Sequence, residues 1–162
     1  MKMIRTVLLC GLTAAMSAGC APESPEPAGL DFTTAYHADG LMVGIHVPDR
    51  TLRPGETFDV TVIAHNQTDA PLPIESFGSD RIHLSVSRYT ARGWEIIEKH
   101  PPAYAEILDV WEIPPHAALQ AEGSLLVSTE WPSGELLRIK AWVNGLPEAS
   151  VAEFVRVAPR EP

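Results

Sequence analysis

The sequence predicts an all-β domain, an antiparallel two-sheet β-sandwich of immunoglobulin-like type with seven or eight strands. Apolar and polar residues alternate with a period of two through most of the chain after residue 40, as strands with one buried face require. The 15 prolines and 11 glycines are spread along the 162 residues and divide them into short runs, which is typical of strands joined by turns. No stretch has the apolar spacing of a helix.

The first two strands of the domain are expected on either side of a well-defined turn. Residues 41–47 and 58–64 both alternate apolar and polar side chains. Between them, Pro54 fixes its φ near the value that a turn needs, and Gly55 tolerates a positive φ. We therefore expect two neighbouring strands joined through a turn at residues 53–56.

The following segments continue the pattern. A turn is expected at residues 66–69, and Pro71 and Pro73 then restrict the chain to an extended edge or crossing segment. The remaining strands are expected at residues 82–87, at 94–97 after a hairpin turn, at 107–113, near 124–129, at 137–143 and at 150–157.

The N-terminal segment predicts export. A short positive region with Lys2 and Arg5 precedes an apolar stretch at residues 6–18, which is too short to remain as a membrane span. The run Ser17-Ala18-Gly19-Cys20 resembles the lipobox of bacterial lipoproteins. The resemblance implies removal of residues 1–19, palmitate-type acylation of Cys20, and anchoring at the periplasmic face of the outer membrane.

The domain boundaries follow from this signal. Residues 20–38 are expected to be a spacer, since they begin with three prolines and two glutamates that favour a solvated, extended chain. The sandwich is expected at 39–158, followed by a C-terminal tail at 159–162.

Several turns of the domain resemble the BsuPI-type intracellular proteinase inhibitor. The residues that carry the resemblance are the turn at 66–69, Ser79-Asp80-Arg81 before a strand, and Trp94 and Trp131. The resemblance implies the inhibitor's β-sandwich fold. Residues 100–105 have no counterpart to that family's phenylalanine-threonine-glutamine segment, so no inhibitory residue is carried over.

Composition and motifs argue against several functions. The net charge of −9 would repel polyphosphates, so we expect no nucleic-acid partner. His46, His65 and His83 lie on the polar side of their strands without metal-ligand spacing, so neither a metal nor a cofactor is expected. No nucleophile elbow or free thiol is evident, and we expect no catalytic residue.

The sequence therefore favours a non-catalytic, lipid-anchored envelope protein, with a protein-binding or structural accessory role toward an unidentified envelope protein. One alternative is an inhibitor of an extracytoplasmic protease, and another is a periplasmic hydrolase. A binding module should expose an apolar patch, whereas an enzyme needs a concave polar pocket. The candidate interaction loop is His100, Pro101, Pro102, Ala103 and Tyr104, and the candidate exposed aromatic residues are Trp131 and Trp142.

Overall fold

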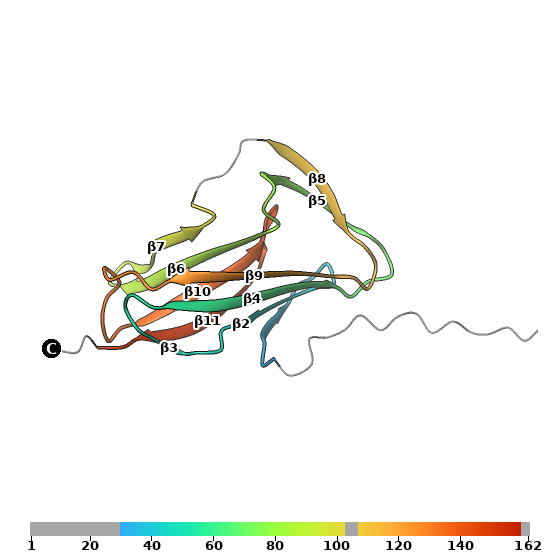
Figure 1. The fold of residues 1–162 in the computed structure, drawn as a ribbon. Coiled ribbons are helices and arrows are strands. Elements are labelled where there is room, and N and C mark those ends of the chain that lie inside the picture. Colours follow the sequence, from blue (N-terminus) through green and yellow to red (C-terminus); the bar gives the residue numbers. More distant parts are fainter. Residues whose placement is uncertain (1–29, 103–106, 160–162) are drawn as a thin grey trace, which may run out of the picture.

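The computed structural model describes residues 30–102 and 107–159, and this part of the chain forms an all-β sandwich (Figure 1). The strands are β1 Thr33–Tyr36, β2 Leu41–His46, β3 Thr51–Leu52, β4 Thr57–Asn66, β5 Leu72–Phe77, β6 Ile82–Thr90, β7 Gly93–His100, β8 Leu108–Ile113, β9 Ala118–Leu126, β10 Leu136–Val143 and β11 Leu146–Val157. The described residues thus contain eleven strands rather than seven or eight. The additional strands include the short β1 and β3, where too few residues are present for alternation to be evident.

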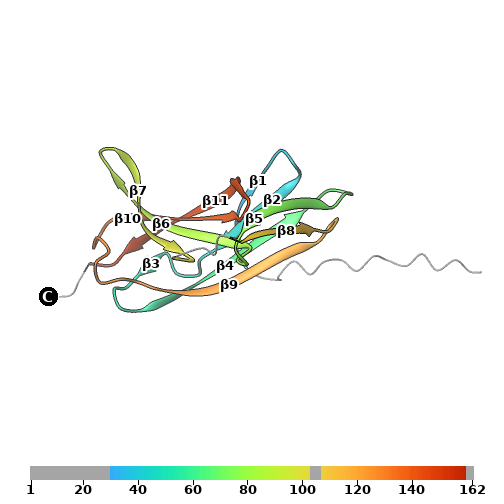
Figure 2. The same cartoon turned by 90° about the horizontal axis from the view of Figure 1, so that it is seen from above.

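The strands are arranged in two main sheets and a ribbon. One sheet has the order β1-β2-β4-β9 and the other has the order β3-β11-β10-β6-β7. Strands β5 and β8 form a separate two-stranded ribbon, which lies across one end of the two sheets (Figures 1 and 2). Every pairing is antiparallel except that of β3 with β11, which is parallel.

The core lies between the two main sheets, on the faces that the alternation predicts. On β4 and β10, every second residue is at most 6% exposed, and burying such side chains is the main driving force for folding. These inward-facing residues are Phe58, Val60, Val62 and Ala64 on β4, and Leu137, Ile139, Ala141 and Val143 on β10.

Two segment boundaries differ from the expectation. Thr33–Tyr36 were expected to belong to the spacer at residues 20–38, but they form β1, which pairs antiparallel with β2. The strand expected near residues 124–129 begins earlier, at Ala118. Its alternation is hidden in the sequence because small residues, Ala121 and Gly123, occupy two inward positions. The signal peptide, Cys20 and the first residues of the spacer lie outside the described residues.

Two buried asparagines and one glycine hold the ribbon against the sandwich. The Asn66 side-chain amide donates to the carbonyl of Ile113 (2.9 Å), and that of Asn144 donates to the carbonyls of Phe77 and Asp80 (2.8 and 2.7 Å). Gly145 has a φ of 97°, and a Cβ atom there would lie 2.2 Å from the carbonyl oxygen of Glu75. These contacts fix the segment from β5 to β6, which forms one end of the site described next. The described residues contain no helix with the length and apolar character of a membrane span.

Candidate interaction groove

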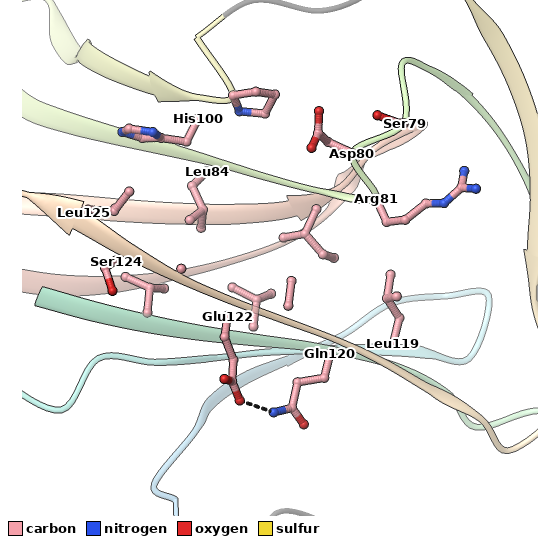
Figure 3. Close-up of a pocket in the computed structure, with 16 residues that line it drawn as sticks. Ser79, Asp80, Arg81, Leu84, His100, Leu119, Gln120, Glu122, Ser124 and Leu125 are labelled. Atoms are coloured by element: carbon pink, nitrogen blue, oxygen red, sulfur yellow. Dashed lines mark hydrogen bonds between the residues drawn. The ribbon is translucent and has the colours of Figure 1, made fainter.

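A groove of about 500 Å³ opens between the two main sheets where β9 faces β6 and the end of β7 (Figure 3). Its floor includes Val60 and Val62 of β4, and Asp80 and Arg81 lie at one end. At this edge the two sheets leave Leu119, Ile82 and Leu84 partly exposed, although Val60 and Val62 beneath them are each only 1% exposed. The groove therefore gives a ligand access to residues that face the interior of the sandwich.

Small side chains on β9 account for the groove. Ala121 pairs with Val62, and Gly123 pairs with Val60, so both small residues face inward. A Cβ atom built on Gly123 would meet no atom within 4 Å. Leucine or valine at these two positions would fill the space that is now open.

The small residues leave apolar side chains of both sheets incompletely covered. Leu119 of β9 and Ile82 and Leu84 of β6 pack against the core but are only half-buried. Figure 3 shows Leu84 pointing from β6 toward β9. Binding of a ligand over such exposed apolar surface is favourable, because it removes the surface from water.

The edge of β9 next to the groove offers backbone hydrogen bonds. Over its nine residues β9 pairs with β4 on one side, and no strand of the described chain pairs with its other side. It contains no proline. Such an edge can pair with an added extended chain.

The predicted interaction loop lies partly at this groove. His100 and Pro101 line it, and Pro102 is exposed nearby in sequence. Ala103 and Tyr104 lie outside the described residues. The structure therefore places the described start of the loop beside β9.

Trp131 is buried, in contrast to the expectation that it lies at the surface. It is 4% exposed, and its ring packs edge-on against Phe58 at 6.3 Å between centroids. Its indole N–H donates to Glu98 (3.0 Å), and the other Glu98 oxygen lies 2.6 Å from Nε2 of His100. Glu98 thus connects Trp131 to the wall of the groove. No pattern in the sequence singles out Glu98, because its partner Trp131 lies 33 residues further along the chain.

The other end of the groove is held by Arg81. Its guanidinium pairs with Asp109 at 2.6 Å and stacks over the ring of Trp111 at 4.5 Å. The indole N–H of Trp111 donates to the hydroxyl of Ser76 (3.0 Å). These contacts join the segment before β6 to the ribbon, and they leave Arg81 engaged rather than available to a ligand.

The outer face of the ribbon carries a second apolar feature. Phe77 and Leu108 are register partners that are 60% and 57% exposed, and Val110 is 65% exposed. Their neighbours on the opposite faces of β5 and β8, Ile74 and Ile113, are buried. The described residues therefore expose an apolar patch of the kind that interaction modules use.

The remaining predicted residues lie elsewhere. Trp142 is half-buried on the outer face of the five-stranded sheet, against His83. His83 faces outward as expected but is 5% exposed. This burial lowers the pKa of its imidazole, and the negative charge of Asp80 opposes that shift. Among residues 30–102 and 107–159, no three His, Cys, Asp or Glu side chains gather as a metal-ligand set.

Comparisons with known proteins support the fold. No protein-family model and no curated protein matches the sequence, so the resemblance to BsuPI-type inhibitors stays a hypothesis. The structure is similar to that of the sporulation control protein Spo0M from Bacillus subtilis, with a TM-score of 0.56 and 14% identity. The match covers 75% of this chain and 50% of Spo0M, so the chain spans about half the length of that protein.

Weaker similarities involve two other solved structures. The CARDB domain of the PF1109 protein from Pyrococcus furiosus gives a TM-score of 0.46 at 10% identity, over 74% of this chain and 94% of that domain. A β-glucosidase from Listeria innocua gives 0.46 at 15% identity, over 75% of this chain and 16% of the enzyme. The described part of this chain is an all-β sandwich with a fold similar to that of Spo0M.

Proposed function

We propose that this protein is a non-catalytic, lipid-anchored accessory domain of the cell envelope that binds an extended segment of another envelope protein. The segment pairs with the free edge of β9 and inserts its side chains into the groove. The observation that carries the proposal is the groove itself, because two inward positions of β9 carry only alanine and glycine beside a strand edge that no described strand pairs with.

The chemistry of the groove specifies the ligand. An added strand directs alternate side chains to one face, so every second residue of the bound segment enters the groove. Valine, leucine and isoleucine side chains line the groove together with polar residues such as Asp80 and His100. We therefore propose an extended segment with small or medium apolar residues at alternate positions.

Filling the groove tests this proposal directly. Gly123→Val places a side chain where no atom lies within 4 Å, and it should stabilise the fold by about 0.5–1 kcal/mol because glycine weakens strands. The same substitution should abolish binding of peptides selected by display on the wild-type protein. A thermal melt separates loss of binding from loss of folding.

Gln120→Val is the matched control. It introduces the same side chain into the same strand. Gln120 borders the groove, but Figure 3 shows its side chain pointing away from it. Peptide binding by this variant should stay within about twofold of the wild type. The proposal fails if Gly123→Val binds the selected peptides normally, or if both variants lose binding equally.

The proposed anchor rests on the Ser17-Ala18-Gly19-Cys20 run. Several acyl chains hold a protein durably on a membrane, since each buried methylene contributes about 0.8 kcal/mol. Cys20→Ser should leave an unprocessed precursor without fatty acid, as read by mass spectrometry of the intact protein. Normal maturation and membrane retention of that variant would exclude the lipobox interpretation.

A further inference from the structure

The outer face of the five-stranded sheet concentrates positive charge in a protein of net charge −9. The sheet register pairs Lys140 of β10 with Ser85 of β6, and Ser85 with Lys99 of β7. The two lysines therefore lie in one row, with their Cα atoms about 10 Å apart across two strand spacings. Arg138 lies two residues from Lys140 on the same face of β10.

These three cations have no acidic partner in the part of the chain that the structure describes. The ion pairs there involve Arg50, Arg53, Arg81, Arg88, His100 and His116. Arg138 instead stacks its guanidinium over Trp94 at 4.5 Å, and Nε of Arg138 has no hydrogen-bond partner. The positive charge of this row is not neutralised within the described domain, so it is available to an anionic ligand.

Aromatic rings flank the row on both sides. Lys140 lies beside Trp142, with Nζ 5.8 Å from the ring centroid. On the other side, the ring centroid of Trp94 lies 5.3 Å from that of Tyr89 and 5.8 Å from that of Phe154. Tyr89 is 67% exposed and Phe154 is 44% exposed. Apolar ring faces are thus presented within reach of the unpaired cations.

We propose that this face binds an acidic polysaccharide. Lys140, Lys99 and the head of Arg138 pair with its carboxylates or other anionic substituents, while sugar rings stack on Tyr89, Phe154 and Trp142. Charge-assisted hydrogen bonds to the cations are the strong contacts, and the rings supply apolar contact area at low entropic cost because aromatic side chains are rigid.

Two features favour a polysaccharide over other anions. A polypeptide of acidic residues alone, such as polyglutamate, would use the cations but offers no ring face to the exposed aromatic residues. A nucleic acid has rings, but every nucleotide carries a phosphate charge, whereas an acidic polysaccharide such as hyaluronan carries one carboxylate per disaccharide and is repelled less by the acidic remainder of the protein. An acidic polysaccharide with one carboxylate per disaccharide combines apolar ring faces with more widely spaced charge.

Isothermal titration of the full chain in detergent with oligogalacturonate and hyaluronan oligosaccharides tests the proposal. Binding to at least one of them is expected, weakening as salt is raised because the charges are exposed. Methyl-esterified oligogalacturonate, which keeps the sugar backbone but lacks the charge, should bind at least about tenfold more weakly. Failure of both acidic sugars to bind overturns the proposal, as does equal or tighter binding of polyglutamate or single-stranded oligothymidylate.

Matched variants locate the site. Lys140→Gln and Tyr89→Ala should each weaken binding of the acidic sugar by about tenfold. Arg53→Gln and Tyr36→Ala are the controls, since both residues are exposed but lie outside the five-stranded sheet. An equal loss of sugar binding in the control variants would show that binding does not depend on the outer face of the five-stranded sheet, and it would overturn the proposal. The groove beside β9 is not involved, so the two proposals fail or stand independently.

Discussion

The two long edges of the sandwich differ in how they close. At one edge, β11 packs against β1 and β2 of the opposite sheet, and inward residues such as Ile45 and Val155 are fully buried. At the other edge, β9 faces β6 across a groove, and inward residues such as Leu119 and Leu84 are partly exposed. The same alternation of apolar and polar residues therefore yields a sealed edge and an open one.

The two edges differ in the volume of their inward side chains and in a polar cluster at the closed edge. The closed edge has isoleucine and valine at its inward positions and is joined by Glu153, which accepts a hydrogen bond from Thr33 and pairs with Arg50 at 3.5 Å. The open edge has Ala121 and Gly123 at its inward positions. Packing at one edge supports the fold, and the missing volume at the other leaves space for a ligand.

The largest expected effect comes from truncating the closed edge. Ile45→Ala removes a side chain that is 0% exposed, and it should cost about 3 kcal/mol of unfolding free energy because a cavity remains. Ile82→Ala makes the same change at the open edge and should cost about 1 kcal/mol, since Ile82 is already half-exposed. Denaturant unfolding of both variants measures the contrast. Equal losses of unfolding free energy in the two variants would mean that the two edges are packed alike.

The polar cluster at the closed edge should contribute less than the core. Glu153 is 7% exposed, and Glu153→Ala leaves the hydroxyl of Thr33 and the charge of Arg50 without their acceptor. We expect a loss of about 1–2 kcal/mol, measured by the same unfolding experiment. Glu122→Ala, which changes an exposed glutamate on β9, should be within about 0.5 kcal/mol of the wild type. Equal losses of unfolding free energy in the two variants would show that Glu153 does not stabilise the closed edge.

The smallest effect concerns pH. Burial lowers the pKa of His83 below its ordinary value of 6.5, so the unfolded chain takes up a proton before the folded chain does. The contribution of His83 to stability is therefore complete above pH 6.5 and is lost as the pH falls from there toward its lowered folded-state pKa. His83→Gln should reduce the fall in melting temperature between pH 7 and pH 5. An unchanged pH dependence would show that His83 does not make this contribution.

Much of the fold is predictable from the sequence because strands with one buried face show their period directly. Residues 41–46, 58–64 and 137–143 lie in strands with the expected inward faces. The short β1 and β3 could not be predicted, because too few residues are present to establish a period. The predicted start of β9 was wrong, because Ala121 and Gly123 stand where large apolar residues would have shown the alternation of a strand.

The candidate site was only partly predictable. His100 and Pro101 could be named because a proline pair ends a strand, but their neighbours across the groove are distant in the sequence. Trp131 lies between Glu130 and Pro132, which suggested a surface turn, whereas its burial depends on Phe58 and Glu98. The row of Lys140, Ser85 and Lys99 depends on strand order, which alternation within single strands does not specify.

Amide hydrogen exchange along β9 tests the central claim most directly. In the free protein, the amides of β9 that point away from β4 should exchange at rates close to those of exposed loops, because no described strand pairs with that edge. A peptide selected for binding should protect those amides by at least about tenfold in the wild type, and should leave them unchanged in Gly123→Val. Slow exchange along the whole of β9 in the free protein, or protection that appears only on other strands, would contradict the account.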